Sequence, residues 1–331
     1  MSEFEAIDAA YGIGDQRAQV EALAARQSAA TPLADGRQVE LYFRTFSSTE
    51  IEHKRAVADE FAAAEVLAVL GARDFTYGAV RLADTHGVPV IDVNAVPRTV
   101  FARAVHVSSD GVGVGSDHDQ EVVRRFADGG VDLMMPFVSG SSLARALSSA
   151  ADQNYHPVVL DLETGEHVTD VAGSVMPSSI YDGTRALAMS RVGEVAAGRA
   201  LDPRARGALE CVESATGVTL TPVGRACSGA VSNVLMVADL VEVLFLGLRR
   251  AGPEPDRVGL VRALESITDH ASVSGGTLSF RPGEHWGCRA MREIEWRQGA
   301  WSVVGDYEAV AGRSSTGSST VTRCISRASS P

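Results

Sequence analysis

The feature of this sequence that most limits its fold is an alternation of apolar strands and amphipathic helices that occurs twice. Residues 55–93 predict a helix, a buried strand, a second helix and another strand, and residues 118–162 repeat the order of helix and strand. Strands that alternate with helices in this way pair in parallel, because each crossover is right-handed and brings a helix back over the sheet. The two repeats therefore predict an α/β fold with two lobes rather than one large sheet.

The rest of the chain has a different character. Residues 16–29 have helical spacing, and residues 39–43 predict a further strand. Residues 183–251 are expected to be mainly helical, and residues 276–305 predict short antiparallel strands joined by glycine-containing turns. The last 20 residues, rich in Ser, Thr and Gly, predict a disordered tail.

Size and charge exclude several classes of protein. A chain of 331 residues is long for one hydrophobic core and comfortable for two. A formal net charge of −12 disfavours nucleic acid as a partner, because a polyanion is bound by basic patches. The apolar segment 234–248 contains Asp239 and Glu242 and is shorter than the roughly 18 residues of a membrane span, so it predicts a buried helix and no transmembrane segment. The acidic N-terminus lacks the features of a secretory signal, so the sequence taken as it stands predicts a cytoplasmic location.

The cysteines leave two alternatives open. None of the four occurs in a C-x-x-C motif, so no zinc site is predicted. Cys211 and Cys227 bracket one loop that contains glycine and proline. In an oxidising compartment they form a disulfide, and otherwise they are two small buried thiols.

Motifs for catalysis are scarce. The sequence has no G-x-S-x-G, no phosphate-binding Walker loop and no H-E-x-x-H. The glycine-rich segment 111–115 lacks the spacing of a dinucleotide-binding loop. The run Ser-Asp-His-Asp at 116–119 is more typical of a helix start, where carboxylates stabilise the helix dipole, than of a metal or acid–base site. We therefore predict no catalytic residue, no metal and no cofactor.

Polar loops follow three of the predicted strands, at 71–77, 92–95 and 139–142. In open parallel sheets, ligands bind in the crevice at the carboxyl ends of the strands. The free N–H groups of a helix N-terminus suit a carboxylate there. Each loop alone is explained by ordinary helix capping. Three of them on two lobes favour a ligand site between the lobes.

Five short segments also occur in a particular order: DGRQVEL at 35–41, a frame AVLG…GVPVID within 67–93, GVDL…S at 130–142, HPVVLD at 156–161 and LSFRPGEH at 278–285. In this order, over most of 15–310, the chain resembles the type I periplasmic substrate-binding proteins of branched-chain amino acid ABC transporters. The resemblance implies two parallel-sheet lobes, flanked by helices and joined by a hinge.

The resemblance implies a function as well as a fold. Such a protein is not an enzyme; it binds an amino acid or other small carboxylate between its lobes and hands it to a transporter permease outside the cytoplasm. Lobe one is expected at 1–104 plus 226–270, lobe two at 105–225 plus 271–311, and the tail at 312–331. Only about 30 residues separate Val100 from Val131, where the family places a further helix, strand and helix, so a reduced second lobe is expected.

The family pattern also implies ligand-binding residues by position. Lobe one supplies Arg73, Asp74, Phe75, Thr76, Asn94 and Ala95, and lobe two supplies Ser139, Ser141, Ser142 and Asp161. By charge, Arg73 pairs with a ligand carboxylate and Asp161 with an ammonium group. The alternatives are a cytoplasmic sensor on the same fold, a degenerate relative that no longer binds, and an α/β enzyme whose site carries no motif.

Overall fold

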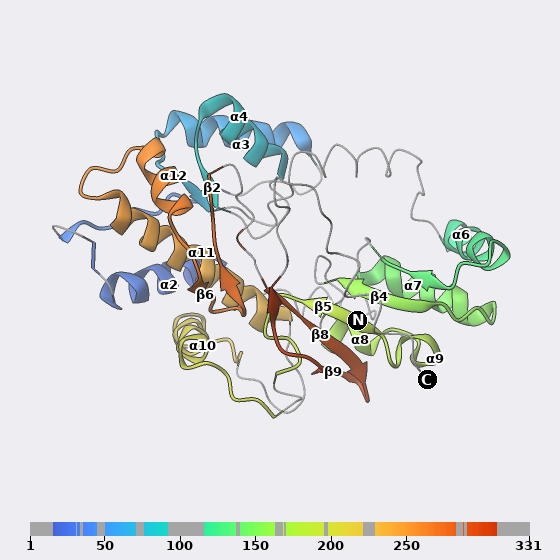
Figure 1. The fold of residues 1–331 in the computed structure, drawn as a ribbon. Coiled ribbons are helices and arrows are strands. Elements are labelled where there is room, and N and C mark those ends of the chain that lie inside the picture. Colours follow the sequence, from blue (N-terminus) through green and yellow to red (C-terminus); the bar gives the residue numbers. More distant parts are fainter. Residues whose placement is uncertain are drawn as a thin grey trace.

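The computed structural model describes residues 16–30, 32–33, 36–44, 50–70, 76–91, 116–136, 140–162, 168, 170–194, 198–220, 229–282, 287 and 290–309. The helices and strands form two groups, which we call lobe one and lobe two (Figure 1). Each lobe combines segments that lie far apart in the sequence.

Lobe one contains ten elements: α2 (Gln16–Ala30), α3 (Ile51–Ala63), β1 (Val69–Leu70), α4 (Thr76–His86), β2 (Val90–Ile91), α10 (Pro203–Thr216), α11 (Gly229–Ala251), α12 (Arg257–Glu265), β6 (His270–Ala271) and β7 (Thr277–Leu278). Lobe two contains the other ten: α6 (Ser116–Asp128), β3 (Leu133–Met134), α7 (Gly140–Asp152), β4 (Val158–Leu162), α8 (Asp170–Ser174), α9 (Ser178–Tyr181), β5 (Arg185–Ala188), β8 (Ala290–Arg297), β9 (Ala300–Val303) and β10 (Glu308–Ala309).

The sheet of lobe one is covered by helices on both faces. Strands β1 and β2 pair in parallel, as the sequence predicted, with Val69 opposite Val90. Both valines pack into the cluster formed with α3 and α4. Their neighbours Leu70 and Ile91 point the other way and pack against the cluster that contains α2, α10 and α11. The alternation of side chains along a strand thus divides the lobe into three layers.

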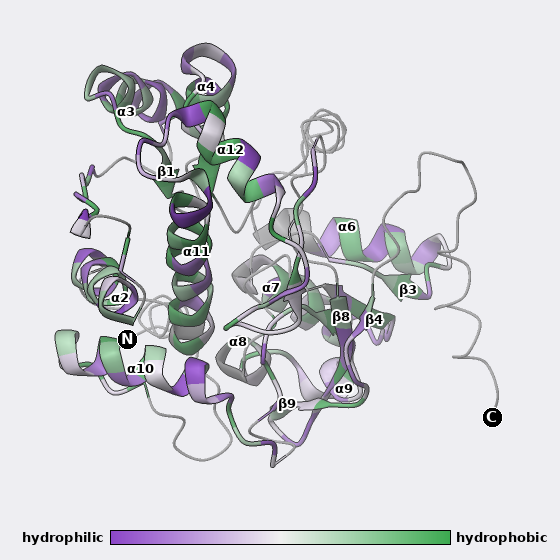
Figure 2. Ribbon diagram, turned by 60° about the vertical axis from the view of Figure 1, so that its left-hand side comes forward, coloured by the Kyte–Doolittle hydropathy of each residue, from purple (hydrophilic) through white to green (hydrophobic). Residues whose placement is uncertain are grey.

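Helix α11 is the core helix of lobe one. Figure 2 shows it as a mostly hydrophobic helix surrounded by the other elements of the lobe. Among the described residues it is the one helix with the length and apolar composition of a membrane span, and 67% of its apolar window lies buried inside the protein. Its buried residues pack against α2, α10 and α12. The sequence prediction of a buried helix at 234–248 is confirmed.

Lobe two is built on a six-stranded sheet in the order β10-β8-β5-β4-β3, with β9 also paired to β8. Strands β3, β4 and β5 are parallel. Strand β8 is antiparallel to β5, β9 and β10, which confirms the antiparallel strands predicted in 276–305. The core includes three aromatic side chains, Tyr181, Trp296 and Trp301, whose rings contact one another.

Residues 183–251 are mainly helical, as expected, through α10 and α11, although Arg185–Ala188 form β5 with Ala186 and Ala188 facing the core. Two other sequence expectations differ from the structure. Residues 37–44 form no helix and pair with no described strand, so the strand predicted at 39–43 is absent from the described part of the chain. Helix α10, expected in lobe two, packs against α2 and α11 in lobe one. The chain therefore returns to lobe one directly after β5 rather than at 226.

An ion pair joins α3 to α4 on the surface of lobe one. Arg81 donates from Nε and Nη2 to the two carboxylate oxygens of Asp59, at 2.6 and 2.9 Å. The Nε2 atom of His86 lies 2.7 Å from Asp59 Oδ1. These hydrogen bonds, from Arg81 first and His86 second, lower the pKa of Asp59 from 3.8 to about 2. The charged form is therefore favoured in the folded protein.

We expect this ion pair to contribute to acid stability in a defined pH window. Because the pKa of Asp59 is lower in the folded than in the unfolded chain, its contribution is complete above pH 3.8 and is lost as the pH falls towards about 2. Thermal melts of wild type and Asp59→Asn should differ at neutral pH and converge across that window. The control is Asp152→Asn, at the exposed end of α7, which should track wild type throughout. A constant difference between wild type and Asp59→Asn down to pH 2 would contradict the assignment.

Candidate functional site

The candidate site begins with two helices that start just after parallel strands. Helix α4 starts at Thr76 after β1, and α7 starts at Gly140 after β3. Parallel pairing places the carboxyl ends of β1 and β2 at one edge of their sheet, and those of β3, β4 and β5 at one edge of theirs. A helix N-terminus at such an edge presents free N–H groups and a partial positive charge. Both lobes thus have the local arrangement that suits an anionic group.

Most of the residues predicted to bind ligand lie outside the described part of the chain, namely Arg73, Asp74, Phe75, Asn94, Ala95 and Ser139. Thr76 is the first residue of α4. Ser141 and Ser142 lie together in the first turn of α7. The Ser142 hydroxyl accepts a hydrogen bond from Arg145 Nη2 at 3.4 Å. Thr76 and the two serines are therefore at helix starts, as the sequence predicted.

Asp161 has a partner inside lobe two. It lies in β4 on the face that packs against α9, and its side chain is fully buried. Tyr181 donates its hydroxyl to Asp161 Oδ2 at 3.2 Å. This carboxylate therefore has a hydrogen-bond partner in the core of the lobe, and its role towards a ligand ammonium group stays a prediction from the sequence.

Cys211 is a free thiol in α10. Its sulfur donates to the carbonyl oxygen of Ala22 in α2, at 3.4 Å. Cys227 lies outside the described residues. Pairing of these two cysteines stays a prediction from the sequence.

The chain passes between the lobes three times. The first crossing, 92–115, runs from β2 to α6 and lies outside the described residues. The second, 189–202, runs from β5 in lobe two to α10 in lobe one, and the third, 279–289, runs from β7 back to β8. Segments that join two lobes in this way are where their relative orientation is set.

The second crossing is held from lobe two by Arg292, a fully buried residue of β8. Its Nη2 atom donates to the carbonyl oxygens of Ser190 and Val192, each at 3.0 Å. Its Nη1 atom donates to Glu194 Oε1 at 2.8 Å. Both partners of the Arg292–Glu194 ion pair are buried, so each helps to balance a charge that water does not reach.

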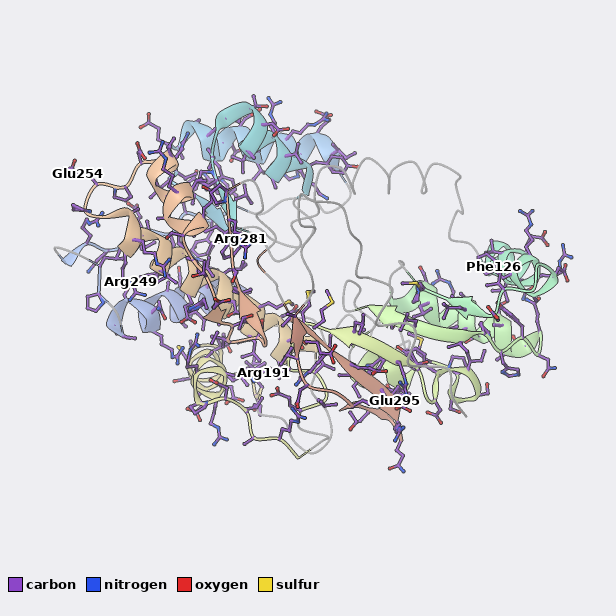
Figure 3. All side chains as sticks on the ribbon, in the orientation of Figure 1. Phe126, Arg191, Arg249, Glu254, Arg281 and Glu295 are labelled. Carbon is purple, nitrogen blue, oxygen red and sulfur yellow. The ribbon has the colours of Figure 1, made fainter. Side chains whose placement is uncertain are left out.

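The same crossing is held from lobe one through Arg191. Its Nε atom donates to the carbonyl oxygen of Val273, in the turn between β6 and β7, at 2.9 Å, and its Nη1 atom lies 3.2 Å from Glu194 Oε2. Figure 3 shows Arg191 near the place where the two lobes meet. We call Arg191, Glu194 and Arg292 the junction clasp.

The turn that Arg191 contacts is itself fixed to α11. The buried carboxylate of Asp239 accepts hydrogen bonds from the backbone N–H groups of Val273 at 2.6 Å and Ser274 at 2.9 Å, and from the hydroxyl of Ser272. A continuous set of polar contacts therefore runs from the core helix of lobe one, through the clasp, to a core strand of lobe two. These contacts connect the two lobes at the second crossing.

Sequence reasoning missed the clasp, although one signal was present. Arg292 alternates with Ile294 and Trp296 in β8, and all three face the core of lobe two. A charged residue in register with two large apolar residues indicates a buried ion pair. Its partner could not be found in the same way, because Glu194 lies in irregular chain about 100 residues earlier.

The comparisons with known proteins give the fold an independent reference. No protein-family model matches the sequence, and no curated protein matches it. The structure is similar to a substrate-binding protein of an ABC transporter from Aeropyrum pernix, with 13% identity, a TM-score of 0.66 and 94% of each chain covered.

Two further solved structures have bound ligands. One is the branched-chain amino acid transporter substrate-binding protein LivJ from Streptococcus pneumoniae in complex with isoleucine, with 14% identity, a TM-score of 0.60, and 90% of this chain and 95% of that chain covered. The other is a solute-binding protein of an ABC transporter from Rhodopseudomonas palustris in complex with 3,4-dihydroxybenzoic acid, with 12% identity, a TM-score of 0.59, and coverages of 88% and 92%. The chain therefore has the fold of type I periplasmic substrate-binding proteins, as the sequence resemblance predicted.

Proposed function

We propose that this protein binds a small solute between its two lobes, leaves it chemically unchanged, and delivers it to the permease of an ABC transporter outside the cytoplasm. The observation that carries this proposal is the fold: two α/β lobes, joined by three chain crossings, whose similarity to solute-binding proteins extends over nearly the whole chain. The junction clasp supports it, because a site shared by two lobes needs a defined orientation between them.

The ligand class follows from the chemistry of the strand ends. Helices α4 and α7 both begin at the carboxyl edge of a parallel sheet, where N–H groups and the helix dipole favour a negative group. Isoleucine and 3,4-dihydroxybenzoic acid, the ligands of the two similar structures, both carry a carboxylate. We therefore propose an amino acid or another small carboxylic acid as the solute, with its carboxylate held by Arg73 and the start of α4.

A thermal-shift screen of amino acids and small carboxylic acids tests this proposal. A ligand that binds only the folded chain raises the melting temperature in proportion to the logarithm of its concentration. For the compound with the largest shift, Arg73→Ala should weaken the affinity by roughly tenfold to a hundredfold in calorimetry, since a charge-assisted hydrogen bond contributes about 1.5–3 kcal/mol.

The matched control is Arg55→Ala, which removes an exposed arginine from α3 of the same lobe. Its affinity for the compound should equal that of wild type. If Arg73→Ala and wild type bind the compound with equal affinity, Arg73 does not contribute to the binding site. A screen in which no carboxylic acid shifts the melting temperature would contradict the ligand class.

A further inference from the structure

The helices of lobe two cover one face of its sheet. Strands β3, β4 and β5 are parallel and lie next to one another in chain order. Right-handed crossovers that always proceed in the same direction place every connecting helix on the same side. Helices α7, α8 and α9 therefore share one face. Among the described elements, no helix packs on the opposite face of this sheet. We call that face the outer face.

The burial of alternate residues confirms this one-sided packing. In β4, Val159 and Asp161 are buried, whereas Val158 is exposed. In β5, Ala186 and Ala188 are buried and belong to the core of the lobe. Parallel sheets are almost always covered on both faces, because their strands are apolar on both sides. The exposure of Val158, over which no described helix packs, therefore needs an explanation.

The outer face carries a group of apolar side chains at the β3 end of the sheet. Val158 is 65% exposed, Leu133 is 49% exposed and Met135, which follows β3, is 45% exposed. Leu133 lies directly opposite Val158 in the parallel register. Beyond β3 the described sheet has no further strand, so this apolar group also reaches the sheet edge. We call Leu133, Met135 and Val158 the apolar corner.

The charges beside the apolar corner are balanced. On β5 and β8, Arg185 Nη1 lies 2.6 Å from Glu293 Oε1, and both side chains are on the outer face. Nearby, Arg297 and Glu295 form a second ion pair at 2.7 Å. The chain as a whole has a net charge of −12, but these four residues sum to zero. A surface with equal numbers of both signs can oppose a copy of itself, because a two-fold axis places each arginine near a glutamate.

We propose that two copies of this protein associate through the outer faces of their lobe-two sheets, with the apolar corners at the centre and Arg185 of each copy beside Glu293 of the other. Two sheets packed face to face lie about 10 Å apart with their side chains interdigitated. The connections between β3, β4 and β5 place their helices on one face of the sheet. The second copy covers the other face. This interface goes beyond solute binding and does not depend on it.

The test is the mass of the particle in solution, measured by light scattering and sedimentation over a range of micromolar concentrations. Wild type should be a dimer, and Val158→Glu or Leu133→Glu should be monomeric, because each places a charge at the apolar centre. Val258→Glu is the matched control, since Val258 is 57% exposed on α12 of lobe one. That variant should remain a dimer. Circular dichroism establishes that all variants are folded.

A charge exchange identifies which surfaces meet. Arg185→Glu and Glu293→Arg should each weaken self-association, since like charges then face each other across the two-fold axis. Mixing the two variants should restore dimers made of one copy of each, because the introduced glutamate and arginine are then complementary. A monomeric wild type, a Val158→Glu variant that dimerises like wild type, or a mixture no more dimeric than its components would overturn the proposal.

Discussion

Arg292→Met should lower the free energy of unfolding by about 3–5 kcal/mol, because it removes the shorter of two arginine contacts to the buried carboxylate of Glu194. The guanidinium of Arg292 is fully buried and binds Glu194 together with two backbone carbonyl oxygens of the second crossing. Methionine fills a similar volume but cannot donate a hydrogen bond to Glu194 or to either carbonyl oxygen. Urea unfolding, followed by circular dichroism, measures the change.

The control for this variant is Arg199→Met in the second crossing. Arg199 also pairs with a carboxylate, that of Asp306, but both side chains are exposed, so its loss should cost no more than about 1 kcal/mol. The double variant Arg292→Met/Glu194→Gln should be more stable than Arg292→Met alone, because it no longer buries a carboxylate that has lost one of its two arginine partners. Equal losses for Arg292→Met and Arg199→Met would show that the junction clasp does not stabilise the crossing.

Trp301→Ala should produce a loss of similar size, about 3–5 kcal/mol, from the core of lobe two. Trp301 is fully buried, and its ring meets those of Tyr181 and Trp296 edge to face, with centroids 5.9 and 5.7 Å apart. Removing the indole leaves a cavity and deletes both aromatic contacts. The control, Val304→Ala, truncates an exposed side chain just after β9 and should change stability by no more than about 0.5 kcal/mol. A Trp301→Ala loss as small as that of Val304→Ala would contradict the assigned core.

The sequence predicted best the elements whose pattern is local. Strand β4 occupies 158–162 as expected, because its apolar run is bounded by a turn at Asn154–Pro157. Helix α7 begins near the serines that precede an apolar helical stripe. The parallel pairing of β1 with β2 followed from the alternation of strand and helix alone.

Elements whose character depends on distant partners were not predictable in the same way. Arg185–Ala188 contains residues that suit a helix as well as a strand, and it is a strand because β4 and β8 pair with it on its two sides. Helix α10 has clear local ends, with an Asp202 cap and Gly217 in the left-handed conformation, but nothing local indicates which lobe it joins. Its lobe is decided by packing against α2 and α11.

The expected reduction of the second lobe stays a prediction. Residues 92–115, where the family places a further helix, strand and helix, lie outside the described part of the chain. The candidate site was anticipated as a set of helix starts, at Thr76 and at Ser141–Ser142. The junction clasp was not, because it joins residues that are distant in sequence and are brought together by the fold.

Mass spectrometry of the small molecules released when the purified protein is denatured tests the solute-binding account most directly. We predict a stoichiometric amount of one amino acid or small carboxylic acid, which is absent when the protein is refolded from denaturant before analysis, and which raises the melting temperature of the refolded protein when it is returned. A released molecule that lacks a carboxylate, or a folded protein that releases nothing and is stabilised by no carboxylic acid, would contradict the account.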